Sequence, residues 1–285
     1  MSTPINERSK ITKSIFISVL SILVLVPIAV FATHSPETQH TWGNYHWART
    51  ANPMALQVID SVTSEWQAEL NLTILDWNKA DALNMSITSS DNRSKTRKRC
   101  NASSGKIRVC NATYGNNGWL GLASIYIDSN GHITKGTAKM NDSYAYYWAD
   151  SIQKAHVMCQ EVGHLFGLGH TSEDGSSQST CMDYSTSENS TRPNDHDIEL
   201  LNEIYAHTDA DDSYAAPVDP ADDGGTTDPA PCRGGPKRCG SGSSADSGNS
   251  DFGRGHLIRS NEFYEEWVEN HADGSKTVHH VTLVH

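Results

Sequence analysis

One twelve-residue segment concentrates residue types that bind metals and move protons: CQEVGHLFGLGH, residues 159–170. Gln160 and His164 are four residues apart, so on a helix they lie on the same face, one turn from each other. Gly167 allows the chain to leave the helix through a C-cap with positive φ, and the turn brings His170 back toward that face. This layout predicts a metal site held by Gln160, His164 and His170.

Glu161 follows the first expected ligand, where its carboxylate can reach a water on the metal without binding the metal itself. Catalytic zinc sites combine three protein ligands, an open fourth position and a neighbouring base. We therefore expect one zinc ion as cofactor, with Glu161 as general base. Calcium is conceivable at Asp128 and Asn130 but is not indicated, because those residues form a Gly/Asn turn that needs no metal.

The segment resembles the metzincin metalloproteases, within them the matrixin-like bacterial and archaeal branch. The family pattern is H-E-x-x-H-x-x-G-x-x-H followed by a Met-turn, and this chain matches it at Glu161, His164, Gly167 and His170. Residues 181–184 (CMDY) resemble the Met-turn. The resemblance covers roughly residues 42–207. It implies an α+β fold with a twisted mixed sheet, an active-site helix, a Met-turn and a C-terminal helix, and the activity of a secreted zinc endopeptidase.

The resemblance also implies roles for residues outside the motif. Met182 would form the floor beneath the metal site, and Tyr184 would line the cleft. Asp197, at the head of the expected last helix, would support the site structurally without binding metal. A protein or peptide substrate would lie extended along an edge strand within residues 125–140, through backbone pairing.

The first ligand position departs from the family, because it holds Gln160 where the pattern has histidine. A carboxamide oxygen is a poorer zinc ligand than an imidazole, and three interpretations follow. Gln160 binds zinc more weakly, another histidine replaces it, or the metal is lost and the chain is a catalytically silent secreted binding protein. Glu161 argues against the last, since a pure binding module has no need for a base there. The replacement histidines considered are His132, His156 and His196; His156 is two turns, about 12 Å, from His164.

Six cysteines fall into three sequence-local pairs, although fifteen pairings are formally open. The pairs are Cys100 with Cys110, Cys159 with Cys181, and Cys232 with Cys239. Disulfides fit an exported chain, with free thiols or metal ligation as the alternative. A Cys159–Cys181 bond would tie the expected active-site helix to the Met-turn. No long propeptide with a zinc-binding cysteine is recognised, so latency of that kind is not expected.

Amino-acid composition and hydrophobic patterning predict four segments of the chain. Residues 1–32 resemble a cleaved signal peptide, with a surface-anchored structural protein as the alternative if the segment is retained. Residues 42–207 form the catalytic domain, 208–255 an acidic linker rich in Pro, Gly and Ser, and 256–285 a small β-hairpin. The net charge of −12 argues against a nucleic-acid partner. We expect a secreted protein with no membrane contact after cleavage; the sequence is silent on oligomeric state.

Periodicity and turn residues predict the individual elements. Helices are expected at residues 61–77, 144–167 and 197–205. Strands are expected at residues 55–60, 82–88, 106–110, 120–128, 133–140, 262–268 and 277–284. The basic run at residues 93–99 is interpreted as a solvated loop.

Overall fold

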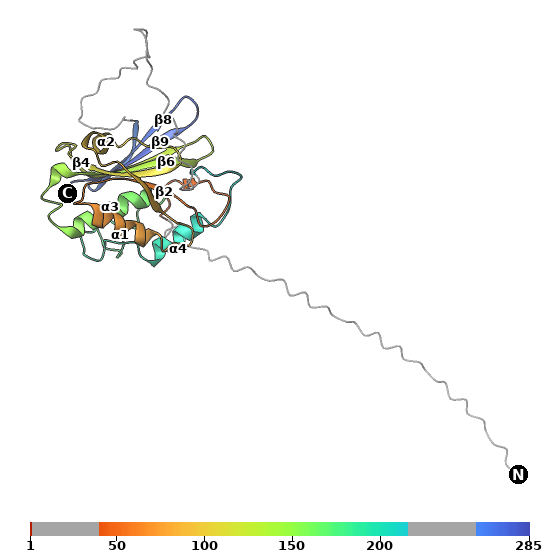
Figure 1. Ribbon diagram of the computed structural model, residues 1–285. Helices are drawn as coiled ribbons and strands as arrows, with labels where there is room; N and C mark the ends of the chain where they lie inside the picture. The colour runs from red at the N-terminus through yellow and green to blue at the C-terminus, as the bar shows by residue number, and fades with distance from the viewer. Residues whose placement is uncertain (2–39, 216–254) are drawn as a thin grey trace, which may run out of the picture. The chain divides into compact units, whose positions relative to one another are not determined.

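A mixed sheet of nine strands organises the chain in the computed structural model, which describes residues 1, 40–215 and 255–285 (Figure 1). The strands run in the order β3-β2-β4-β6-β5-β9-β8-β7, and β1 also pairs with β6. The strand bounds are β1 His46–Trp47, β2 Gln57–Ser61, β3 Ser86–Ser90, β4 Lys106–Ala112, β5 Trp119–Ile127, β6 His132–Asn141, β7 His256–Ser260, β8 Tyr264–Asn270 and β9 Lys276–Leu283.

Four α-helices accompany the sheet in the described ranges: α1 Gln67–Trp77, α2 Ser94–Arg99, α3 Ser151–His164 and α4 Asp195–Ile204, with a 3₁₀ turn η1 at Asp142–Tyr144. The α+β class is confirmed. None of these helices is long and apolar enough to cross a membrane. Residues 2–32 of the predicted signal peptide, residues 216–254 of the predicted linker and the pair Cys232–Cys239 lie outside the described residues.

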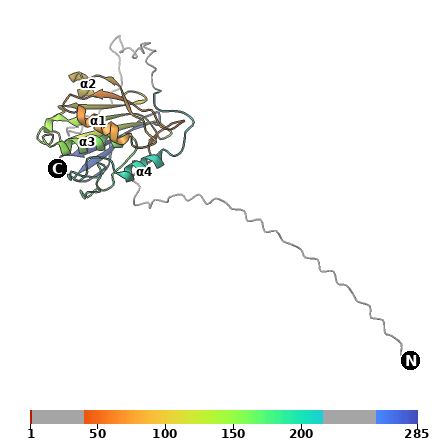
Figure 2. The same cartoon turned by 60° about the horizontal axis from the view of Figure 1, so that its bottom comes forward.

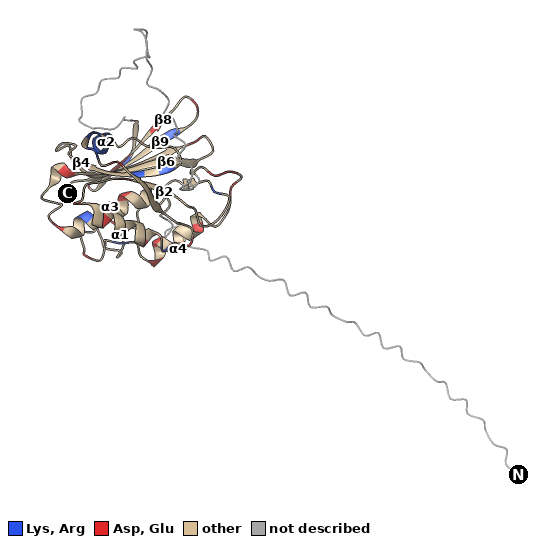
Figure 3. Cartoon of the chain, in the orientation of Figure 1, with Lys and Arg blue, Asp and Glu red and all other residues tan. Residues whose placement is uncertain are grey.

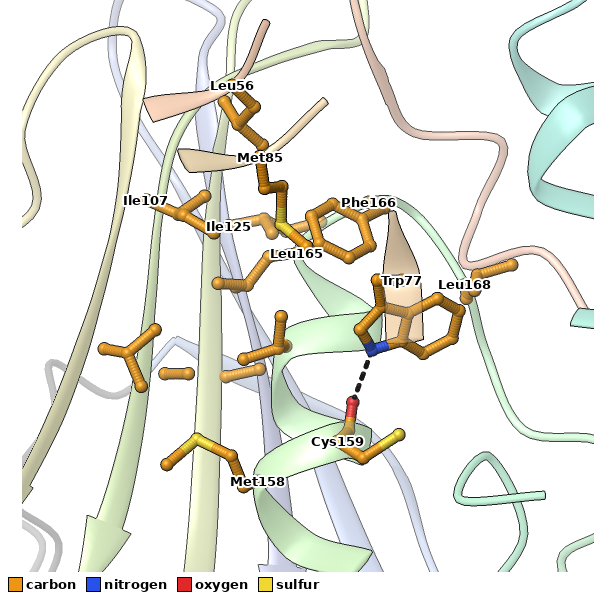
Figure 4. Packing of buried hydrophobic residues seen from close by; sticks show 14 of the residues in the cluster. Leu56, Trp77, Met85, Ile107, Ile125, Met158, Cys159, Leu165, Phe166 and Leu168 are labelled. Carbon is orange, nitrogen blue, oxygen red and sulfur yellow. Dashed lines mark hydrogen bonds between the residues drawn. The ribbon is translucent and has the colours of Figure 1, made fainter. Parts of the chain in front are cut away.

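Helices α1 and α3 lie side by side on one face of the sheet (Figures 1 and 2). The main core fills the space between them and the strands, because α3 turns Val157, Met158 and Val162 inward. Trp77 from α1 is fully buried there, and its indole N–H donates to the carbonyl of Cys159 at 3.2 Å (Figure 4). This packing fixes α3 against the sheet.

Several predicted elements differ from the structure. The helix expected at 61–77 starts at Gln67, and the strand expected at 82–88 lies at Ser86–Ser90. The long helix expected at 144–167 starts only at Ser151, because the Asp150 side chain accepts the N–H of Ile152 and caps the helix there. The basic run is a short exposed helix, α2, rather than a loop; its ribbon is blue in Figure 3, the colour of Lys and Arg. It ends at Cys100, which adopts a left-handed conformation.

The C-terminal strands extend the sheet beside β5. β9 pairs antiparallel with β5, placing His280 opposite Ala123 and Thr282 opposite Gly121. β8 and the unpredicted strand β7 follow outward. The expectation of an edge strand within residues 125–140 is therefore wrong: β5 lies between β6 and β9, and β6 lies between β4 and β5. A pairing between segments more than a hundred residues apart leaves no local signal in the sequence.

Residues 208–215, assigned from sequence to the linker, are hydrogen-bonded to the folded part. The Asp209 N–H donates to the Arg49 carbonyl at 2.7 Å, and the Ser213 N–H donates to the Ala48 carbonyl at 2.9 Å. The chain after α4 therefore returns along the segment that contains β1.

Candidate metal site

Helix α3 supplies three of the predicted site residues, Gln160, Glu161 and His164. Glu161 is fully buried and His164 is 1% exposed, both on the side of the helix that meets β5 and β9. The helix ends at His164, and Gly167 follows with φ of +92°. A side chain at Gly167 would meet the Tyr45 carbonyl at 1.8 Å, so glycine is required for the sharp exit that returns His170 to the site.

His164, His170 and His280 converge at one point. One ring nitrogen from each lies within 4.8 Å of the others, so the three could hold a metal ion. The Nε2 atoms of His164 and His170 are 3.1 Å apart. The His164 ring centroid is 4.1 Å from that of His280, and the His170 centroid is 4.6 Å from it. The structure thus unites two predicted ligands with a histidine from β9 that was not among the predicted ligands.

The hydroxyl of Tyr184 faces the same point. Its oxygen lies 2.8 Å from Nε2 of His170 and 2.9 Å from Nε2 of His280. One hydroxyl carries one hydrogen, so it can donate to only one of these nitrogens at a time. Tyr184, predicted to line the cleft, thus contacts two of the three histidines.

The three histidines are neutral at physiological pH. Burial, together with the nearby His280, lowers the pKa of His164 to about 3. Burial likewise lowers the pKa of His280 to about 3 and the pKa of His170 well below its ordinary value. Nδ1 of His164 lies 2.8 Å from the Leu168 carbonyl, which can only accept, so Nδ1 carries the hydrogen and Nε2 presents its lone pair.

Gln160 is fully buried, but both ends of its amide contact protein groups. Its Nε2 donates to the Asp183 carbonyl at 2.8 Å. Its Oε1 lies 3.0 Å from the hydroxyl of Thr282 on β9. In this arrangement Gln160 joins α3 to the turn after Met182 and to the C-terminal strand.

Glu161 lies against β5 and β9. Its Oε1 is 2.6 Å from the Thr282 hydroxyl, and its Oε2 is 3.6 Å from Nδ1 of His280. A side chain at Gly121 would approach Oε1 to 2.2 Å, so only glycine on β5 leaves room for this carboxylate. Burial raises the pKa of Glu161 to about 7, opposed by His164 and by the hydrogen bond from Thr282. A carboxyl group with that pKa can both take up and release a proton near neutrality.

The turn that contains Met182 packs beneath α3. A side chain at Gly163 would meet the Met182 sulfur at 2.6 Å, which shows how closely this methionine lies under the helix. The Cys159–Cys181 disulfide, expected from sequence, joins the helix and the turn covalently. A second disulfide joins Cys100 and Cys110.

Asp197 braces the same turn without approaching the three histidines. Its carboxylate accepts hydrogen bonds from the Thr180 hydroxyl and from the Asn194 N–H. Thr180 in turn accepts the N–H of Met182 at 3.0 Å. The other carboxylate oxygen of Asp197 lies 3.2 Å from Nε2 of His40.

A cavity of about 140 Å³ adjoins the histidines. One wall is Trp42, whose ring lies 5.3 Å from that of His164 and whose N–H donates to Glu266 on β8 at 2.9 Å. Pockets for drug-sized ligands are about 300–1,000 Å³, so this space holds a few waters and not an extended peptide.

None of the histidines considered from sequence as replacements joins this group. His156 is buried one turn before Gln160, with Nδ1 2.5 Å from the Ser190 carbonyl. His196 lies beside His40 and Asp197, and His132 lies near Asp209. The sequence did carry a signal for His280. In the strand VHHV at residues 278–281, alternation places His280 on the same face as the core residue Val278.

Comparison of the sequence with protein-family models and with curated proteins found no match.

Proposed function

We propose that this protein is a secreted zinc endopeptidase of the metzincin type, held closed by its own C-terminal strand. The observation that carries the proposal is the convergence of His164, His170 and His280 beside the buried carboxylate of Glu161. The two disulfides fit the oxidising compartment into which a secreted chain would pass.

The residues at this point fit a cation. His164 presents a lone pair toward His170, and the single hydroxyl hydrogen of Tyr184 serves only one of two facing nitrogens. In the described part of the chain, Nδ1 of His280 and Oε2 of Glu161 have no hydrogen-bond partner although both are buried. A zinc ion accepts one lone pair from each of the three neutral imidazoles. The ring nitrogens that face one another without enough hydrogen-bond donors would then each have a partner.

Zinc, when bound, supplies the Lewis acidity that peptide-bond hydrolysis requires. Glu161 is the group that holds and moves the proton: it takes one from the attacking water and delivers it to the leaving amine. Its pKa of about 7 suits both steps. Tyr184, with its hydroxyl between two of the histidines, is placed to donate to an oxygen that gains negative charge.

β9 lies where an extended substrate would pair with β5. It runs antiparallel to β5, and its backbone fills that side of the strand over the whole stretch beside Glu161. Its residues His280 and Thr282 contact the metal-binding histidines and Glu161 respectively. In this closed arrangement His280 is the third zinc ligand, and peptide cleavage requires β9 to leave.

Departure of β9 frees Gln160. Once the Thr282 hydroxyl is withdrawn, Oε1 of Gln160 loses its donor and lies one helical turn from His164 on the same face. We therefore propose that Gln160, His164 and His170 bind zinc in the open enzyme. In the closed enzyme His280 takes the place of Gln160 as the third ligand. The chain would be latent without a zinc-binding cysteine.

The test measures hydrolysis of casein by the full-length chain with zinc, with and without a chelator. Thr282→Val, which loosens the closed form, should hydrolyse casein faster than the wild type. Adding Glu161→Gln should abolish that activity, whereas the matched change Glu199→Gln on the exposed side of α4 should not. Zinc-loaded protein that cleaves nothing, even with Thr282→Val, would contradict the proposal.

That negative result would favour a second function, a catalytically silent secreted binding protein on the same fold. Its supporting observation is that β9 fills the side of β5 and engages both Gln160 and Glu161. Zinc would then serve to hold the C-terminal strand in place.

A further inference from the structure

A second group of histidines lies outside the site described above. His46 on β1, His207 and Asp209 each offer one ligand atom within 4.8 Å of the others. His132, at the start of β6, adds a fourth side chain, with its Nε2 3.5 Å from Oδ1 of Asp209. The four residues come from three separate segments of the chain.

The distances among His46, His207 and Asp209 suit three corners of a tetrahedral ion. Oδ1 of Asp209 lies 3.7 Å from Nε2 of His46 and 3.6 Å from Nε2 of His207. The two Nε2 atoms lie 3.2 Å from each other. A tetrahedral zinc with ligands at about 2.0–2.1 Å places its ligand atoms about 3.3 Å apart, close to these separations.

The surroundings orient the rings and the carboxylate. Nδ1 of His46 faces the Asn44 carbonyl at 3.2 Å, so Nδ1 carries the hydrogen and Nε2 is left to bind. The other carboxylate oxygen of Asp209, Oδ2, accepts a hydrogen bond from the backbone N–H of Arg49 at 3.0 Å. Nδ1 of His132 lies 3.8 Å from the Asp128 carboxylate. Polar groups behind the ligands in this way are typical of metal sites.

We propose that His46, His132, His207 and Asp209 form a second, structural zinc site. Three nitrogens and one carboxylate oxygen favour zinc over calcium or magnesium, which prefer oxygen ligands throughout. With the His132 ring turned toward the ion, four protein ligands leave no open position, so the ion stabilises the fold and takes no part in hydrolysis. The side chain of His207 is 53% exposed, which gives the ion a route from solvent.

The ion would join three segments of the chain, and the residues before one of them line the cavity beside the three histidines. It would tie β1 to the start of β6 and to the chain that follows α4. The residues just before β1 contact the site, because the N–H of Trp42 donates to the Gly167 carbonyl at 2.6 Å. This proposal does not depend on the proposed function, since the two sites share no residue.

Zinc content of the full-length protein, after dialysis against a weak chelator, tests the proposal. Asp209→Asn and His207→Ala should each hold one zinc ion per chain fewer than the wild type, which should hold two if the three-histidine site is also filled. The matched control Asp211→Asn changes an exposed residue of the same segment and should hold as many as the wild type. Asp209→Asn is nearly isosteric, and the exposed side chain of His207 can be shortened with little loss of packing.

His280→Ala separates the two sites. The zinc that remains on this variant should show four nitrogen or oxygen ligands at about 2.0–2.1 Å by X-ray absorption. The same zinc content in Asp209→Asn, His207→Ala and wild type would overturn the second site. A shell of six oxygens on the zinc retained by His280→Ala would overturn it as well.

Discussion

The hydroxyl of Thr282 lies 2.6 Å from Oε1 of Glu161 and 3.0 Å from Oε1 of Gln160. The hydroxyl has one hydrogen and therefore donates to one of these acceptors at a time. Through this single group, the C-terminal strand engages both the proposed base and the residue that replaces the first histidine of the motif. The closed form therefore depends on Thr282 as well as on His280.

Thr282→Val should raise peptidase activity. Valine keeps the shape of threonine but removes the hydrogen bond to Glu161, and a hydrogen bond to a charged group is worth about 1.5–3 kcal/mol. That difference shifts the balance toward the open form by about tenfold or more, and initial rates of peptide hydrolysis should rise in proportion. Thr282→Ser retains the hydroxyl and should behave as wild type. Equal activity in the valine and serine variants would exclude this role for Thr282.

Removing the Cys159–Cys181 disulfide should weaken zinc binding at the three histidines. The bond fixes the turn that contains Met182 under α3, so its loss loosens the support of the ligands. We expect Cys159→Ser with Cys181→Ser to lower zinc affinity about tenfold or more, in the range seen when groups supporting metal ligands are removed.

Cys100→Ser with Cys110→Ser is the matched control, because that disulfide joins α2's end to β4. Each double variant should lose on the order of 3 kcal/mol of stability, but only the first should lose zinc affinity. Competition with a fluorescent zinc chelator measures the difference. Unchanged affinity without the Cys159–Cys181 bond would refute the link between this disulfide and the metal.

Stability of the metal-free protein should fall as the pH drops below about 6.5. Burial lowers the pKa of His156 despite its bond to the Ser190 carbonyl, so the native state stays neutral where the unfolded chain takes up a proton. The stability is fully present above the ordinary histidine pKa and is lost below it, by at most about 1.4 kcal/mol per pH unit for this residue.

His156→Gln should flatten that dependence. Its side-chain amide can still donate to the Ser190 carbonyl, but it does not titrate. Urea unfolding between pH 7 and pH 5, with a chelator present, compares the slopes. An identical slope in the variant and the wild type would show that His156 does not contribute.

Gln160→His should make His280 dispensable for zinc. The new imidazole would lie one turn from His164, as the metal motif predicts for its first ligand. Gln160→His combined with His280→Ala should therefore bind zinc more tightly than His280→Ala alone, as titration calorimetry would show. Gln160→Asn is the control, since it adds no ring nitrogen. Equal affinity of the histidine and asparagine double variants would mean that residue 160 does not reach the metal.

The sequence predicted the parts of the site that depend on local spacing. Helical spacing predicted that Gln160 and His164 lie on one helix, as they do in α3, and Gly167 has the expected positive φ. The Cys159–Cys181 pair was also expected from its position on either side of the motif. Each of these follows from steric rules that act over a few residues, or from a motif in which the spacing is fixed.

His280 could not be placed in the same way. Its contact with His164 depends on β9 pairing with β5 across more than 150 residues of chain, and strand pairing over such a distance is set by the whole sheet. Alternation along β9 indicates which face His280 occupies but not which strand lies beside it. For the same reason an edge strand was expected within residues 125–140, which in the structure belong to the inner strands β5 and β6.

A comparison of the zinc content of His280→Ala with that of His279→Ala tests the central claim most directly. The two histidines are neighbours on β9, but His279 points to the opposite face, where its Nδ1 lies 2.7 Å from the Ser124 hydroxyl. Replacing His280 should remove one zinc ion per chain, whereas replacing His279 should remove none. Equal zinc content in the two variants would contradict the assignment of His280 as a ligand of the closed site.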